Sequence, residues 1–332
     1  MRHTSTIRSF VFAIILVLSL GLASNANATG KERPDANNEG VIAASDSGVT
    51  IATAHEWTVE EMENAKPMTP PMVAETTFPE ITTGLPDVTT DVSLPDGPAG
   101  SIPGTPPTDL SADNIGLFAS GEVDSYSSYP FSAIGKLFFV TPQGSASCSA
   151  AVIKSNEIWT AGHCVHAGNG SSSGWFSDFV FVPQYRNGSA PCGQWEIADV
   201  VTSSAWFNSG SNDQDYAKGS ISNPNTGCTG TLGFAFNQSY SQDFLAVGYP
   251  GNIGGGERMI FCSNPLKRTL SGNPNPYSID CPMTQGSSGG PYIIRNDELN
   301  GNVSFGIPSV YPNEVFSPYF GSGAKSLYDY SF

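Results

Sequence analysis

Short apolar runs that end at turn-forming residues recur through the C-terminal two thirds of the chain, and they limit its fold more than any other feature. Four of them cover residues 133–140, 178–182, 244–249 and 301–307. Glycine, proline, asparagine and serine separate these runs, at a spacing typical of an antiparallel sandwich or barrel. Charged residues make up 13% of the chain, against a usual ~25%, which excludes a long-helix or coiled-coil protein.

The first 28 residues have the pattern of an export signal. Arg2, His3 and Arg8 make a basic start, and an apolar run covers residues 10–22 before the small-x-small sequence at 26–28. This run is shorter than the ~20 residues that span a bilayer. We therefore predict that the signal peptide (residues 1–28) is cleaved after Ala28. The product should be secreted, extracellular or periplasmic, with no membrane association.

Residues 29–120 differ in character from the rest of the chain. They hold 3 basic and 15 acidic side chains, and ten prolines lie between Pro67 and Pro107. A stretch with so little apolar patterning cannot offset the entropy lost on ordering. We expect an acidic, proline-rich linker or removable pro-segment, with one helical patch at residues 58–63.

The net charge of the whole chain, −16, argues against nucleic acid as a partner.

All six cysteines follow that segment, in an exported domain that we place at residues 121–332. An even cysteine count in an exported protein favours disulfides, and six cysteines allow fifteen pairings. Zinc is the alternative, because Cys148, His163, Cys164 and His166 are all ligand types. Their spacing matches no common zinc motif, so we expect no metal.

The supply of histidine restricts the chemistry that the folded domain can perform. Of the four histidines, His3 lies in the signal and His55 in the acidic segment. Any imidazole base of the mature protein must therefore be His163 or His166. A strand-like run leads into a small-residue turn that presents His163.

A second candidate element is the glycine-rich sequence at residues 285–291, which surrounds Ser288. Flanking glycines allow a tight turn that aims backbone N–H groups at one point, as an oxyanion requires. The sequence also satisfies Gly-x-Ser-x-Gly, the nucleophile motif of α/β-hydrolases. That fold places its histidine after the serine, and no histidine follows His166, so this interpretation is excluded.

Together, the sequences at residues 160–164 and 286–291 resemble those of chymotrypsin/trypsin-like serine peptidases, most closely the secreted bacterial and glutamyl-endopeptidase-like branches. The resemblance extends over about residues 128–310. It implies two antiparallel six-stranded β-barrels with the active site between them. It also implies a serine endopeptidase that acts on proteins or peptides, needs no cofactor, is made as a proenzyme and is a monomer.

Carried over residue by residue, the resemblance makes His163 the general base and Ser288 the nucleophile. Asp215 matches the family's acid, with Asp213 as the nearest rival. The N–H groups of Gly286 and Ser288 match the oxyanion hole. We expect His166 to be a surface residue.

The resemblance also locates a substrate pocket. Pro282 stands where trypsin-like members carry aspartate, and Val303 stands where glutamyl-specific members carry histidine. Neither charge-reading side chain is present, so we expect an apolar to small pocket. Its expected residues are Pro282, Met283, Thr284, Val303, Ser304, Phe305 and Gly306.

The family often has a bridge with the span of Cys148 and Cys164 beside its histidine, and we expect that bridge here. We further expect Cys192 to pair with Cys228 and Cys262 with Cys281, although the sequence does not determine these two pairings.

Maturation should depart from that of the animal enzymes. Ser287 replaces the aspartate that pairs with the new amino terminus in those enzymes. We therefore expect the acidic segment to cover the cleft or to assist folding, with a cut near residues 119–121.

Two alternatives to a peptidase are a non-catalytic binding or adhesion protein and an esterase on the same scaffold.

Overall fold

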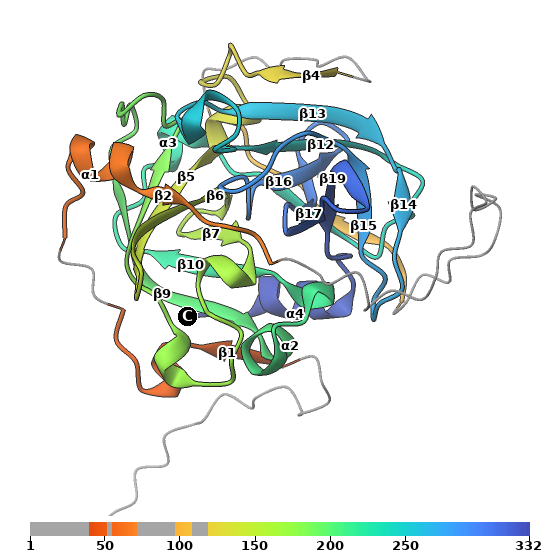
Figure 1. Ribbon diagram of the computed structural model, residues 1–332, viewed down its shortest axis with the longest axis horizontal. Coiled ribbons are helices and arrows are strands. Elements are labelled where there is room, and N and C mark those ends of the chain that lie inside the picture. Colours follow the sequence, from red (N-terminus) through yellow and green to blue (C-terminus); the bar gives the residue numbers. More distant parts are fainter. Residues whose placement is uncertain (1–39, 52–54, 72–96, 108–118) are drawn as a thin grey trace, which may run out of the picture. The chain divides into compact units, whose positions relative to one another are not determined.

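The computed structural model describes residues 40–51, 55–71, 97–107 and 119–332 (Figure 1). The signal peptide expected at residues 1–28 lies outside this part of the chain. Among the described residues, no helix has both the length and the apolar character needed to cross a bilayer.

Six strands of the first half close into a barrel. Strand β9 pairs with both β8 and β10, so the ring β9-β10-β7-β6-β5-β8 has no free edge. On these strands Phe138, Trp159 and Trp195 are almost completely buried. The strands are β5 (Ile134–Thr141), β6 (Gly144–Lys154), β7 (Glu157–Thr160), β8 (Ser177–Pro183), β9 (Trp195–Ser203) and β10 (Ala217–Ile221).

The second half differs in detail from the expected six-stranded antiparallel barrel. Its strands form one sheet of order β3-β11-β17-β16-β12-β13-β4 and another of order β14-β15-β19-β18, and β11 runs parallel to β17. The Cys262–Cys281 disulfide and a bond from the Ser304 N–H to the Phe316 carbonyl link the two sheets. The strands beyond β10 are β11 (Gly233–Phe236), β12 (Asp243–Gly248), β13 (Ile260–Pro265), β14 (Arg268–Thr269), β15 (Tyr277–Asp280), β16 (Pro291–Ile294), β17 (Glu298–Asn302), β18 (Phe305–Ile307) and β19 (Tyr311–Ser317).

Helices are short and lie around the strands. They are α1 (Val59–Asn64), α2 (Ser204–Ser209), α3 (Thr226–Thr229) and α4 (Ser322–Asp329). Helix α4 contacts β9, β10 and β11, so it covers the junction between the two halves.

The expectation of an extended, unpacked linker is wrong for the described parts of residues 29–120. Strand β1 (Val41–Ala43) pairs with β9, β2 (Lys66–Pro67) with β6, β3 (Gly100–Ile102) with β11 and β4 (Ala119–Glu122) with β13. These short strands need few apolar residues of their own, because strands already in place supply the hydrogen-bond partners.

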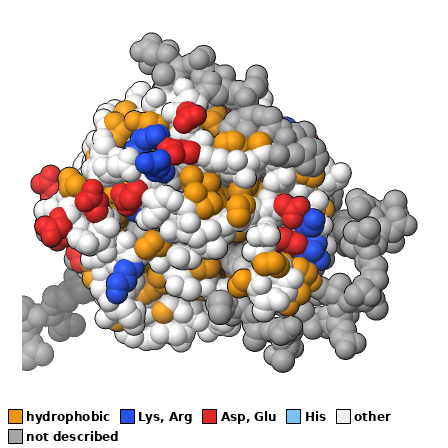
Figure 2. All heavy atoms as spheres, turned by 45° about the horizontal axis from the view of Figure 1, so that its top comes forward, with side chains coloured by type: hydrophobic (Ala, Val, Ile, Leu, Met, Phe, Trp, Pro, Cys, Tyr) orange, Lys and Arg blue, Asp and Glu red, His pale blue; other side chains and the backbone are white. Residues whose placement is uncertain are grey.

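Two apolar side chains anchor the segment before β2. Trp57 is 2% exposed, its indole N–H donates to the Asp178 carbonyl at 3.0 Å, and its ring centroid lies 5.5 Å from that of Phe138. Helix α1 lies where the sequence predicted a helical patch. Thr58 caps its N-terminus in a capping box, and the helix buries Met62. Figure 2 shows several acidic side chains at the left of the molecule, the side on which Figure 1 draws α1.

Replacing Trp159 with alanine should lower the free energy of unfolding by about 3–5 kcal/mol. The Trp159 ring lies 5.0 Å from Phe320 and 5.2 Å from Phe234, and its N–H donates to Asn302 Oδ1 at 3.1 Å. The loss therefore includes both the packing between the two halves and a buried hydrogen bond. Urea denaturation measures it.

The exposed Val310 provides a control, because its replacement by alanine should change stability by less than about 0.5 kcal/mol. Equal effects of the Trp159 and Val310 substitutions would contradict the role assigned to Trp159.

Candidate active site

Three loops carry the residues that the sequence singled out. His163 lies in a single 3₁₀ turn, Gly162–Cys164, directly after β7, and Asp215 lies directly before β10. Because β7 and β10 are paired, with Ala217 opposite Thr160, their ends bring His163 and Asp215 together. Ser288 lies in the loop that leads into β16.

The Asp215 carboxylate fixes the orientation of the His163 ring. The His163 backbone N–H donates to Asp215 Oδ1 at 2.7 Å, and His163 Nδ1 lies 2.6 Å from Asp215 Oδ2. Asp215 is fully buried and His163 is 4% exposed. The Ser304 hydroxyl donates to Asp215 Oδ2 at 2.5 Å. With Nδ1 donating to the carboxylate, the ring keeps its Nε2 lone pair to accept a proton.

Close packing beside His163 leaves no room for a side chain at Gly162. A Cβ there would lie 2.6 Å from the Trp206 ring and 2.9 Å from Asp215 Oδ1. This glycine therefore allows the indole and the carboxylate to enclose the turn that carries His163.

Ser288 is fully buried, and its loop packs against the strand end that leads to His163. The Ser149 N–H in β6 donates to the Ser288 carbonyl at 2.7 Å. Gly289 has a φ of +79°, and a Cβ there would lie 2.8 Å from the Ala161 nitrogen. Neither Ser288 Oγ nor His163 Nε2 has a hydrogen-bond partner among the described residues. Buried polar atoms without a partner are uncommon in folded proteins.

The Gly286 N–H points into the cleft, where a backbone carbonyl of the N-terminal segment already accepts its hydrogen. Gly286 has a φ of +86°, and the Ser149 hydroxyl donates to its carbonyl at 2.9 Å. Its N–H donates to the Met68 carbonyl at 3.0 Å. Sequence reasoning allowed for an acidic segment that covers the cleft, but it did not single out Met68, because nothing in a proline-rich stretch marks one residue for this contact.

A pocket of about 170 Å³ opens beside Ser288. All but one of the expected substrate-binding residues line it; the exception is Pro282, which is exposed and lines a different hollow. Cys281 and Met283 on either side of Pro282 are buried, whereas Pro282 is exposed, so its side chain faces outward. The lining residues are Met283, Thr284, Gln285, Ser287, Ser288, Val303, Ser304, Phe305, Gly306, Pro308, Tyr311, Pro312, Glu314 and Val315, together with Thr69, Pro70 and Pro71 from the N-terminal segment.

Glu314 adds a carboxylate to this otherwise largely apolar pocket, and sequence reasoning missed it. Arg268 binds it through two hydrogen bonds of 2.7 and 2.8 Å, and the Ser278 hydroxyl adds a third of 2.8 Å. This pairing compensates the buried negative charge, so Glu314 does not offer an unpaired carboxylate to a basic side chain.

The expectation that His166 is a surface residue is wrong. Its ring is fully buried and stacks on Phe207 at 4.3 Å. Nε2 lies 2.8 Å from the Ser171 carbonyl, and the Gly168 N–H donates to Nδ1 at 2.9 Å. Since both nitrogens are occupied, His166 cannot act as a base. Sequence reasoning did not detect this burial, because Phe207, on which the ring stacks, lies far along the chain in α2.

The rival acid Asp213 lies in a different set of contacts. Its Oδ2 accepts a hydrogen bond of 2.8 Å from the Asn273 N–H. Of the two candidate aspartates, Asp215 is the one hydrogen-bonded to His163.

Three disulfides join Cys148 to Cys164, Cys192 to Cys228 and Cys262 to Cys281. The first is the bridge that the resemblance implied, and the other two are the expected pairings that the sequence did not determine. Cys148, Cys164 and His163 come within 4.8 Å of one another. The two sulfurs are bonded to each other and are not thiolates, the form of cysteine that binds zinc.

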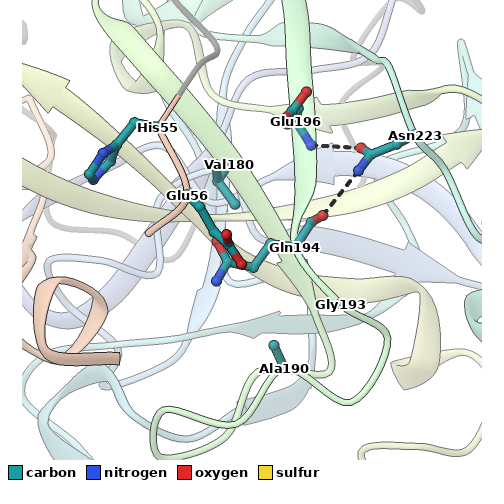
Figure 3. Close-up of a pocket in the computed structure, with 8 residues that line it drawn as sticks. All are labelled: His55, Glu56, Val180, Ala190, Gly193, Gln194, Glu196 and Asn223. Carbon is teal, nitrogen blue, oxygen red and sulfur yellow. Dashed lines mark hydrogen bonds between the residues drawn. The ribbon is translucent and has the colours of Figure 1, made fainter. Parts of the chain in front are cut away.

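A larger hollow of about 360 Å³ lies away from Ser288, beside β9 (Figure 3). His55 and Glu56 line it from the N-terminal segment. Its opposite wall is held by a hydrogen bond from the Glu196 N–H to Asn223 Oδ1 at 2.9 Å. None of the residues singled out for catalysis lines it, which favours the pocket beside Ser288 as the reactive site.

Comparison with known proteins agrees with this geometry. The family model "Trypsin-like peptidase domain" matches residues 148–301. The structure of a thermostable serine protease, AL20, from an extremophilic microorganism is 37% identical, with a TM-score of 0.55 over 60% of this chain and 96% of that one. The chain belongs to the trypsin-like serine peptidases.

Two further structures are similar to this peptidase. The protease Anisep from Arthrobacter nicotinovorans is 30% identical, with a TM-score of 0.55 over 61% of this chain and 96% of that one. A Glu endopeptidase, 20% identical with a TM-score of 0.54 over 65% of this chain and 97% of that one, shares the fold. No curated protein sequence shows significant similarity to the chain.

The family model and the similar structures together identify the protein as a serine-type endopeptidase with the chymotrypsin-like double-barrel fold.

The buried His166 should make the peptidase less stable as the pH falls below about 6.5. Burial lowers the pKa of this ring, an effect that the hydrogen bond to Ser171 only partly opposes. The folded state then binds fewer protons at His166 than the unfolded chain does. Urea denaturation at pH 7.5 and pH 5 should show a smaller loss of stability in the His166→Phe variant than in the unmodified peptidase. Equal losses in the two proteins would contradict this assignment.

Proposed function

We propose that His163, Asp215 and Ser288 form the catalytic triad of a secreted serine endopeptidase made as a proenzyme. The observation that carries this proposal is the His163–Asp215 pair, in which a buried carboxylate holds Nδ1 and leaves Nε2 without a partner. The equally unpartnered hydroxyl of Ser288 is the nucleophile that this base requires.

The mechanism follows from these positions. His163 Nε2 takes the Ser288 hydroxyl proton as Oγ attacks the carbonyl carbon of a peptide bond, and Asp215 stabilises the imidazolium that forms. The N–H groups of Gly286 and Ser288 donate to the resulting oxyanion. His163 then gives its proton to the leaving amine nitrogen, and water hydrolyses the acyl ester on Ser288.

Substrate side chains of small to moderate apolar character should occupy the pocket beside Ser288. Met283, Val303 and Phe305 line it, and Arg268 pairs with the lining carboxylate of Glu314. The residues on its acyl side, Val303–Gly306, would pair with the backbone of the substrate that precedes the scissile bond.

The proposed processing has two steps. The signal at residues 1–28 is removed on export, and the acidic segment at residues 29–120 is removed on activation, leaving a peptidase domain at 121–332. The three disulfides support an oxidising compartment. The cut that we expect near residues 119–121 falls within β4, so β4 must leave β13 before it can be cleaved.

Ser288→Ala should reduce hydrolysis of casein by the secreted enzyme at least ~10⁴-fold while the fold persists. A fluorophosphonate should label the unmodified enzyme, and mass spectrometry should locate the adduct on Ser288. A variant that still cleaves casein would exclude the triad. If the unmodified enzyme binds casein without cleaving it, a binding protein is favoured, and if it cleaves only esters, an esterase is favoured.

A peptide-library profile of the secreted enzyme should show cleavage after small and apolar residues. The reason is that no unpaired charge lines the pocket among the described residues. A profile dominated by cleavage after lysine, arginine or glutamate would show that the pocket is assigned incorrectly.

A further inference from the structure

The N-terminal segment passes through the cleft on both sides of Ser288. Lys66 and Pro67 lie along β6 in parallel register with Ala146 and Ser147 (Figure 1). The Met68 N–H then donates to the Ser147 carbonyl at 2.8 Å. Thr69, Pro70 and Pro71 continue along the wall of the pocket beside Ser288.

The segment uses the group that an oxyanion would use. The Gly286 N–H is bound to the Met68 carbonyl at 3.0 Å. Pro67 fills the space above two glycines, since a Cβ at either Gly251 or Gly286 would lie 2.9 Å from its ring. The fit between a rigid proline and two side-chain-free positions indicates a binding site for this segment.

The direction of the chain is opposite to that of a productive substrate. In a substrate, the part before the scissile bond occupies the pocket formed by Val303–Gly306, and the leaving amine lies on the other side of Ser288, where His163 can protonate it. Here the later residues, Thr69–Pro71, line the pocket, whereas the earlier ones, Lys66 and Pro67, lie along β6.

We propose that Lys66–Pro71 is an intramolecular inhibitor that occupies the cleft in reverse and is therefore not cleaved by Ser288. The proposal rests on the triad proposed above. Attack on the Met68 carbonyl would have to expel the Thr69 nitrogen on the pocket side, away from the proton on His163. Met68 blocks the oxyanion hole, and the reversed backbone prevents the acyl transfer that would release the segment.

Trp57 is the anchor that holds the inhibitor in place. Its backbone exchanges two hydrogen bonds with the Gln194 side chain, at 3.2 and 2.7 Å, and its ring is buried against the first barrel. Because Trp57 and Met68 are joined by a short stretch that contains α1, its binding keeps Met68 at a high effective concentration beside Gly286.

Two substitutions test the inhibition in the full chain with its signal removed. Activity is measured before any processing of the chain can be detected by intact-mass spectrometry. Trp57→Ala removes the anchor, and Gly251→Ala places a methyl group against Pro67 from the enzyme side. Each should raise the initial rate of casein hydrolysis at least ~10-fold over the unmodified chain, since loss of a buried aromatic side chain or overpacking costs enough binding energy for such a change.

Matched controls are Glu60→Gln, on the exposed face of α1, and Gly227→Ala, where a Cβ meets only ordinary contacts. Neither should change the rate. If the unmodified full chain hydrolyses casein as fast as both activating variants, the inhibition is excluded while the proposed peptidase function stands. If no variant hydrolyses casein and fluorophosphonate leaves Ser288 unlabelled in all of them, the proposed function fails, and the inference fails with it.

A synthetic peptide with the sequence of residues 57–71 tests the direction of binding. Added to the Trp57→Ala chain, it should restore inhibition and remain intact by mass spectrometry. A scrambled peptide of the same composition should not inhibit. Cleavage between Met68 and Thr69 would show binding in the substrate direction and would overturn the proposal. Absence of inhibition by the native peptide at concentrations well above those of the enzyme would overturn it as well.

Discussion

The arrangement of the site depends on one buried carboxylate. An ionised aspartate without partners would be strongly destabilising at full burial, and Asp215 is stabilised by the His163 backbone N–H, the His163 ring and the Ser304 hydroxyl. The first two donors belong to the first barrel, and Ser304 belongs to the second half. The contact that orients the imidazole therefore also fixes one half of the molecule against the other.

Other contacts across the same junction also hold the two halves of the molecule together. Asn302 accepts from the Trp159 indole and donates to the Asp215 carbonyl at 3.1 Å, and Ser149 in β6 holds both the Ser288 and Gly286 carbonyls. The loop with Ser288 is thus attached to the barrel that carries His163. Packing between the two halves therefore sets the positions of the side chains at the site. These positions matter because a small displacement would reduce activity.

The sequence was sufficient for the β-rich fold class. It also singled out the regions around His163 and Ser288, because each motif is short, contiguous and chemically distinctive. It favoured Asp215 over Asp213 only through the resemblance; the hydrogen bonds that distinguish them join residues 52 positions apart. The stacking of His166 on Phe207 and the packing of Trp57 on Phe138 could not be predicted, since these partners are remote in sequence. The short strands β1 to β4 have no periodicity long enough to detect, and their stability comes from strands already formed.

Reverse binding resolves a conflict inherent in any inhibitor made of peptide. Contacts that hold a chain in a substrate's orientation also align its carbonyl for attack, so tight binding and resistance to cleavage oppose each other. When the backbone runs the other way, the Met68 carbonyl can still bind the Gly286 N–H, but the leaving nitrogen is separated from the acid that must protonate it. Affinity can then come from the tether and from Trp57, remote from the reacting atoms, without giving a better substrate. Release therefore depends on loss of the anchor or the tether and not on the chemistry of Ser288.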